Sequence, residues 1–237
     1  MKPLSSTSLI IFTTLVSTMA IAQDDDGIKR EIELGALVTS GNTQERSLNF
    51  AGSVIIDREK WEYNFSLDGL YTSSDSEVKG QRFYGIASAK YELTEDSSIL
   101  TRFSHEDDRF SGFDSQSDFT ISYGRGFLQN RTDMGLTVNT GPGVRWSRLD
   151  NSVFEEPIFR VAGDYDWTIS SSAAFNQQIS TEIGTDSNIY RSETGIETRI
   201  LENLTLKFSL NIKHQTIVPA GRDKTDTETA VTFVMNF

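Results

Sequence analysis

The residues best suited to acid–base chemistry in this chain are its two histidines, His105 and His214. They are the only side chains whose unperturbed pKa lies near neutrality. His105 follows Ser104 and precedes Asp107, and a serine–histidine–carboxylate set is the machinery of many hydrolases. Neighbouring residues of a strand point to opposite faces, so Ser104 cannot reach His105 if this segment is extended. We therefore favour solvated rim positions for both histidines and keep a hydrolase as an alternative.

A second chemical possibility is a hard-cation site in the segment 107–117, where Asp107, Asp108 and Asp114 supply carboxylate oxygens. Their spacing matches no calcium loop, and the Phe-Ser-Gly-Phe sequence between them is typical of a packed turn. We expect a structural loop. The sequence predicts no catalytic residue, no metal and no cofactor, since no phosphate loop, nucleotide fingerprint or cysteine–histidine cluster occurs.

Charged side chains also recur on single faces of extended segments, and we predict that these faces line a wet lumen. Each unpaired charge in a dry core would cost several kcal/mol, on the order of the penalty for burying an ion. In a wet lumen, by contrast, water hydrates the charges. The lumen-lining candidates are Arg191, Glu193, Glu197, Arg199, Asp164, Asp166 and Lys207.

Composition and the N-terminus restrict the class of protein. The chain has 237 residues, no cysteine and a formal net charge of −12, which argues against nucleic acid as a partner. Residues 1–22 read as a cleaved signal peptide with a short apolar region and an Ala-Ile-Ala cleavage site. Residues 23–27 then form a short acidic periplasmic segment, and residues 28–237 form one all-β domain.

Alternation of apolar and polar residues predicts twelve strands. It is clearest from Trp61 to Tyr71, where aromatic and aliphatic residues occupy every second position. Gly141-Pro142-Gly143 predicts a bulge or strand exit. The expected strands are Ile28–Thr39, Arg46–Asp57, Trp61–Tyr71, Gln81–Leu93, Ser98–Glu106, Asp118–Leu128, Asp133–Arg148, Ile158–Ile169, Ala173–Gly184, Ile189–Ile200, Leu204–His214 and Asp226–Phe237.

The strand lengths favour a transmembrane antiparallel up-and-down β-barrel over a soluble sandwich. Most segments have about 9–11 residues, which is the length that a tilted strand needs to cross a bilayer. Short connections largely alternate with long ones, as in barrels whose turns face the periplasm. The long connections are expected at 73–80, 107–117, 149–157 and 215–225.

The last segment, Asp226–Phe237, is expected to close the barrel by pairing with Ile28–Thr39. Its apolar face ends in Phe233, Met235 and Phe237. A final strand that stops on an aromatic residue is typical of the assembly signal of outer-membrane barrels. We therefore expect these three side chains to face lipid and to direct assembly.

Four motifs carry a resemblance to a known family: Gly41-Asn42-Thr43, the run from Glu106 to Phe113, the run from Thr140 to Trp146, and the run from Arg160 to Trp167. With them the chain resembles the YdiY-like family of outer-membrane proteins, which is named for salt induction. The resemblance implies an outer-membrane β-barrel and a link to salt or osmotic stress. It implies no substrate or activity.

The sequence thus predicts a protein of the Gram-negative outer membrane that acts as a narrow passive pore or as a structural envelope component, and not as an enzyme. Expected partners are outer-membrane lipids, lipopolysaccharide and the barrel assembly machinery, and the barrel is expected to be a monomer. An outer-membrane hydrolase with rim histidines and a soluble periplasmic lipid-binding barrel are the alternative functions.

Overall fold

Twelve antiparallel strands close into a single barrel in the computed structural model, which describes residues 27–39, 45–74, 77–108, 113–128, 130–150 and 152–236. The expected signal peptide and Phe237 lie outside these residues. The strands are β1 (Ile28–Thr39), β2 (Glu45–Arg58), β3 (Trp61–Ser74), β4 (Glu77–Thr94), β5 (Ser97–Asp108), β6 (Ser115–Phe127), β7 (Met134–Leu149), β8 (Ser152–Ser170), β9 (Ala173–Gly184), β10 (Asn188–Leu201), β11 (Leu204–Gln215) and β12 (Thr225–Asn236).

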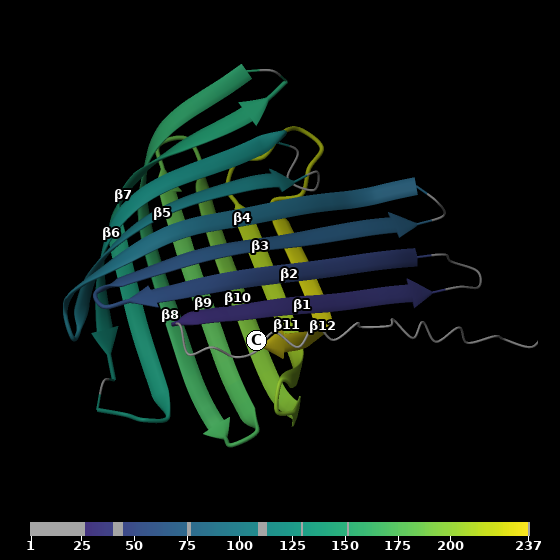
Figure 1. Cartoon of the computed structure of the whole chain (residues 1–237). Helices are drawn as coiled ribbons and strands as arrows, with labels where there is room; N and C mark the ends of the chain where they lie inside the picture. The colour runs from purple at the N-terminus through teal and green to yellow at the C-terminus, as the bar shows by residue number, and fades with distance from the viewer. Residues whose placement is uncertain are drawn as a thin grey trace, which may run out of the picture.

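Each strand pairs with its neighbours in sequence, and β1 pairs with β12, so the predicted up-and-down barrel is confirmed. In Figure 1 strands β1–β4 cross the view at a shallow angle, whereas β8–β12 run steeply behind them. Opposite walls of a barrel cross in this way because every strand is tilted against the barrel axis. Within the described ranges, no helix is long and apolar enough to span a membrane.

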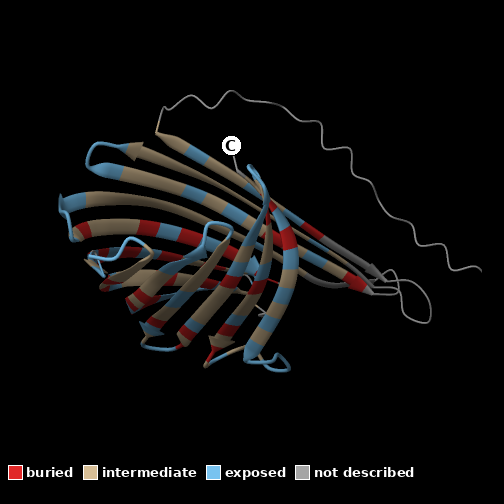
Figure 2. Ribbon diagram, turned by 90° about the horizontal axis from the view of Figure 1, so that it is seen from below, coloured by how far each residue is buried: buried red, intermediate tan, exposed pale blue. Residues whose placement is uncertain are grey.

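The two faces of the barrel wall differ as the alternation predicts. Exposed and less exposed residues alternate along the strands (Figure 2), because successive side chains point to opposite sides of a strand. Outward positions carry large apolar side chains, and many inward positions carry polar ones. Exposed apolar residues include Phe65, Leu67, Phe103, Ile121, Phe159, Ile179, Ile196, Phe208, Val231 and Phe233.

Two of the predicted long connections are wrong, because their residues are mostly strand. β3 continues to Ser74 and β4 begins at Glu77, and β7 and β8 are separated only by residues 150–151. Residues 152–157 keep the antiparallel register with β7, so that Glu155 pairs with Trp146. Backbone hydrogen bonds therefore extend the hairpins beyond the apolar part of the strands. We define the loop side as the end at which β5, β7, β9 and β11 finish, and the turn side as the opposite end.

The bulge expected at Gly141-Pro142-Gly143 is absent from the described β7. Register with β8 is continuous, and Pro142 lies opposite Phe159. Pairing with β6 is interrupted only between Thr120–Gly143 and Tyr123–Thr140, because proline has no backbone N–H to donate. A side chain at position 141 would overlap the carbonyl oxygen of Ile121, so glycine allows the two backbones to approach.

Candidate functional site in the barrel lumen

The inward side chains enclose a cavity of about 610 Å³ that is lined by residues of β1–β5 and β7–β12. Most of its lining residues are polar or charged, with serine, asparagine, arginine, lysine and carboxylate side chains among them, although aliphatic side chains also reach the wall. Such a wall suits water and hydrated solutes rather than an apolar ligand. The cavity is therefore the candidate functional site.

Four of the seven residues predicted to line a lumen lie on this cavity, namely Arg191, Glu193, Asp164 and Lys207. Lys207 Nζ lies 2.9 Å from Glu33 Oε1 and 3.5 Å from Glu193 Oε1. Asp164 Oδ2 accepts a 3.5 Å hydrogen bond from the Asn139 amide. The structure thus brings these four predicted side chains, which come from three strands, onto one cavity.

The other three predicted residues lie toward the turn side and do not line the cavity. Glu197 Oε1 accepts a hydrogen bond of 3.0 Å from the Asn176 side-chain amide. Arg199 and Asp166 are exposed near the turn-side ends of β10 and β8.

Arg145 is the most deeply buried charge in the described part of the chain, with 0% exposure. Its Nε lies 2.9 Å from Asp118 Oδ1, and its Nη1 lies 3.5 Å from Glu156 Oε1. A third carboxylate, that of Glu182, lies 4.0 Å from Nη2, and Nη1 also donates to the carbonyl oxygen of Ser187 at 3.3 Å. Carboxylates from three strands therefore surround this guanidinium, which compensates for its removal from water.

Glu156 also fixes the connection between β9 and β10. Its Oε2 accepts hydrogen bonds from the backbone N–H of Asp186 at 2.8 Å and of Ser187 at 3.3 Å. Because Glu156 is itself held by Arg145, the connection is anchored to buried charges at the loop side. This end of the barrel wall is consequently ordered by side chains that point inward.

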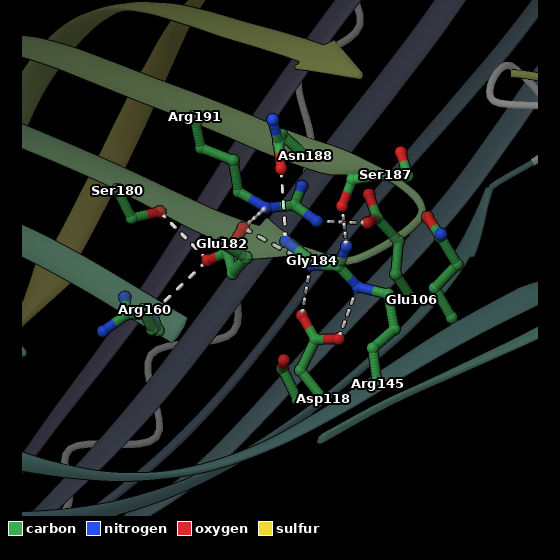
Figure 3. Close-up of polar contacts among 12 residues, drawn as sticks. Glu106, Asp118, Arg145, Arg160, Ser180, Glu182, Gly184, Ser187, Asn188 and Arg191 are labelled. Atoms are coloured by element: carbon green, nitrogen blue, oxygen red, sulfur yellow. Dashed lines mark hydrogen bonds and ion pairs between the residues drawn. The ribbon is translucent and has the colours of Figure 1, made fainter. Parts of the chain in front are cut away.

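Glu182 links three arginines, as Figure 3 shows. Its Oε1 lies 3.4 Å from Arg160 Nε, and its Oε2 lies 3.9 Å from Arg191 Nε. Ser180 Oγ donates to Oε1 at 3.3 Å. A single carboxylate is thus shared among several guanidinium groups.

Glu106 forms the ion pairs that cross the lumen. Its Oε2 lies 2.7 Å from Arg191 Nη2, and its Oε1 lies 3.0 Å from Lys213 Nζ. Lys213 Nζ also lies 2.9 Å from Asp108 Oδ2. Glu106 and Asp108 belong to β5, which is diametrically opposite β11 in the ring of twelve strands. The lumen is therefore bridged from wall to wall, and its free cross-section is narrow at this level.

Most of these bridging residues were not among the predicted site residues. Periodicity alone places Glu106, Arg160 and Glu182 on polar faces, but it does not say which of them meet. The motif runs offered a better signal, since they contain Glu106, Asp108, Arg145, Arg160 and Asp164. In the structure these residues converge on the lumen from β5, β7 and β8.

The residues considered for cation binding and for catalysis lie on both faces of the barrel wall, and His105, Asp107 and Asp114 line a second cavity of about 360 Å³. Asp108 is buried and faces inward, whereas Asp107 is exposed on the other face of β5. No group of three potential metal ligands occurs among the described residues. His105 Nδ1 lies 2.8 Å from Ser117 Oγ, its cross-strand partner, and His214 Nδ1 lies 2.7 Å from Thr225 Oγ1. Both histidines are on the outer face of the barrel.

Two of the three assembly-signal candidates can be placed. Phe233 and Met235 lie on the outward face of β12, and Phe233 is 55% exposed. β12 pairs with β1 from Phe233 to Asn236, which confirms the predicted closing strand. The role of these side chains in assembly stays a prediction, and Phe237 lies outside the described residues.

A closed barrel with an apolar outer face and many charged side chains inside defines the class of transmembrane β-barrels. Solved structures of this class are similar in fold. The translocator domain of the autotransporter NalP from Neisseria meningitidis has a TM-score of 0.54 and 9% identity, covering 91% of this chain and 89% of that chain. The NanC porin has a TM-score of 0.52 and 10% identity, covering 87% and 98%. An outer-membrane channel from Pseudomonas putida F1 has a TM-score of 0.52 and 10% identity, covering 91% and 97%.

The chain belongs to the family described as "Protein of unknown function, DUF481", whose model matches residues 32–237. It is 25% identical over 221 residues to "Uncharacterized protein YdiY" of Escherichia coli strain K12, and the match covers 91% of this chain and 87% of that protein. These matches confirm the YdiY-like resemblance.

Proposed function

We propose that this protein is an integral outer-membrane β-barrel that acts as a narrow passive pore for small polar solutes. The single observation that carries the proposal is the polar cavity of about 610 Å³ inside a closed barrel. The NanC porin and the Pseudomonas putida channel lend support as barrels of similar fold. The aqueous path would run through the lumen past the pairs formed by Glu106.

The outer face supports the membrane assignment. Phe65, Phe208 and Val231 are each about half exposed or more, although each lies in the middle part of its strand. Burying such side chains in hydrocarbon is favourable by about 25 cal/mol per Å² of apolar surface. We propose that outer-membrane lipids cover this belt, that lipopolysaccharide contacts the loop side, and that a cleaved signal peptide and the barrel assembly machinery deliver a monomer.

The bridge across the lumen limits what can pass. Arg191 and Lys213 reach the opposite wall at Glu106, so a solute must fit beside these side chains. Ion pairs in a wet lumen exchange partners more readily than those in a dry core. The pore proposed here is accordingly small, and its permeability depends on a few charged side chains.

A structural envelope role is the second candidate, and the same bridge favours it. If the pairs of Glu106 block the lumen completely, the barrel would serve only as a rigid element of the outer membrane. The two functions differ in one property, which is passage of solute through the folded protein.

A hydrolase and a soluble lipid carrier both fit the geometry less well. No carboxylate contacts the ring of His105 or His214 in the described part of the chain, so no triad is formed there. A soluble lipid carrier would expose polar residues outside and apolar ones inside, which is the reverse of the observed pattern. We propose that the protein is not an enzyme. The link to salt or osmotic stress also stays a prediction.

Proteoliposome swelling tests the pore. Folded protein should admit small sugars and amino acids and should exclude solutes much wider than the lumen. Replacing Lys213 with alanine removes the charge that spans the lumen, and it should raise the swelling rate and the size limit. A membrane-inserted, folded wild-type barrel that admits no solute would contradict the pore and favour the structural role.

A further inference from the structure

Arg102 is a buried cation that forms no ion pair with a carboxylate among the described residues. It is 7% exposed and lies on the cavity wall. Its Nη1 donates to Ser104 Oγ at 2.9 Å, and its Nη2 donates to the hydroxyl of Tyr84. Both partners are neutral. A guanidinium in this setting has lost much of its hydration and has gained no opposite charge in contact with it.

A second arginine adds positive charge at the same wall. Arg160 also lines the cavity, and its charge and that of Arg102 are close enough to repel each other. Arg160 forms one ion pair in the described chain, through Nε to Glu182 at 3.4 Å. Its two terminal nitrogens have no partner there, so they remain available as donors on the cavity side.

The carboxylates nearby do not balance these two cations. Glu182 lies 3.4 Å from Arg160, but it also faces Arg145 at 4.0 Å and Arg191 at 3.9 Å, so its single charge is divided among three guanidinium groups. Asp164 lines the same cavity and attracts both arginines, but it forms no ion pair with a described residue, and one carboxylate is set against two guanidinium groups. Glu106 is committed to the bridge across the lumen. The wall between the two arginines therefore has an excess of donors.

One neutral hydroxyl on the cavity wall, that of Tyr84, adds to that excess. Thr120 pairs across the sheet with Arg102, and Gly141 pairs with Arg160, so the wall between them is built from β6 and β7. The hydroxyls of Thr120 and Ser122 in this wall form no hydrogen bond in the described chain, but neither residue lines the cavity. Tyr84 accepts from Arg102, which leaves its own O–H free to donate.

We propose that the lumen cavity binds a small oxyanion, a carboxylate or a phosphate, between Arg102 and Arg160, with the Tyr84 hydroxyl as a third donor. Oxygen atoms of such an anion match the forked geometry of guanidinium groups, which a spherical halide does not. The inference deepens the proposed pore by naming its solute class. The inferred site rests on the proposed pore only as the route by which the anion reaches the cavity.

Calorimetric titration of the folded, detergent-solubilised full chain with inorganic phosphate and with acetate tests the site. We expect saturable binding of an oxyanion, and about tenfold weaker binding (about 1.4 kcal/mol) after Arg102→Gln, because a charge-assisted hydrogen bond is lost. Arg102→Lys should retain part of the affinity. Arg125→Gln is the matched control, because Arg125 is exposed on the outer face beside Phe127.

Folding of each variant is checked by the heat-dependent gel shift typical of membrane barrels. If Arg102→Gln does not fold, Tyr84→Phe removes only the third donor and should still weaken binding. Absence of saturable binding to the wild type, equal affinity for chloride, or unchanged affinity in the folded variants would overturn the inference. A barrel that conducts but does not bind oxyanions would refute the site and leave the pore intact. A barrel that binds oxyanions but does not conduct would refute the pore and leave the site intact.

Discussion

Lys207 Nζ lies 2.9 Å from Glu33 Oε1, so an ion pair joins β11 to β1 across the closing strand β12. Thr232 Oγ1 of β12 donates to Glu33 Oε2 at 3.3 Å. The ladder between β1 and β12 contains only the four pairs from Glu31–Asn236 to Leu34–Phe233 among the described residues. Side chains inside the lumen therefore supplement a short backbone seam.

This seam predicts that Lys207→Met destabilises the barrel. Loss of the cation leaves Glu33 without its ion pair near the closure, and losing a hydrogen bond to a charged group costs about 1.5–3 kcal/mol. The control is Lys90→Met, because Lys90 pairs with Glu62 at 2.8 Å on a wall with a long ladder and greater exposure. That change should cost about 0–1 kcal/mol. Urea unfolding of the refolded protein, followed by tryptophan fluorescence, measures both, and equal losses would contradict the role of the seam.

Arg145→Met should be among the most damaging single substitutions. It removes the guanidinium from three carboxylates in a fully buried position, and we expect a loss of about 3–5 kcal/mol in the free energy of unfolding. Arg131→Met is the control, since Arg131 pairs with Asp133 in an exposed turn. Arg131→Met should leave the midpoint of the unfolding transition unchanged. A stable Arg145→Met barrel would show that the carboxylates are neutralised in another way.

Gly141→Ala should prevent the close approach of β6 and β7. A methyl group there would overlap the backbone at Ile121, which cannot move without breaking the ladder. Overpacking of this kind costs about 1–3 kcal/mol or more. Gly163→Ala provides the control, because a methyl group at Gly163 meets nothing within 4 Å. Comparable unfolding midpoints for the two variants would refute the close-approach explanation.

Deletion of Phe237 should reduce the amount of folded barrel in the outer membrane more than a substitution in a connection does. The reason is the expected recognition of a terminal aromatic residue during assembly. Arg222→Ala, in the connection between β11 and β12, serves as the comparison. Heat-dependent gel mobility of outer-membrane fractions measures the folded fraction. Wild-type levels after deletion would show that Phe237 is dispensable for assembly.

The strands were predictable because lipid on one side and water on the other impose a period of two on the residues. Trp61 to Tyr71 shows this period plainly, and β3 begins at the predicted residue and continues to Ser74. The ends were less predictable, since segments such as residues 152–157 continue as paired strand without an apolar face.

The contacts across the lumen were not predictable from periodicity. Glu106 and Arg191 are 85 residues apart, and their pairing depends on which walls face each other after the barrel closes. Arg145 was inconspicuous for the same reason, because a single arginine beside Trp146 gives no sign of three carboxylate partners. The spacing of charged residues identifies which face of a strand they share, but not which residues contact one another. Arg199 and Asp166 accordingly lie on the predicted inward faces of their strands but do not line the cavity.

Cysteine accessibility within single-channel recordings tests the central claim most directly, because the chain contains no cysteine of its own. Ser66 lines the cavity, whereas the adjacent Phe65 is 50% exposed on the outer face. A charged methanethiosulfonate reagent should change the current steps of Ser66→Cys irreversibly and leave those of Phe65→Cys unchanged. Absence of current through folded protein, or equal sensitivity of the two variants, would contradict conduction through the lumen.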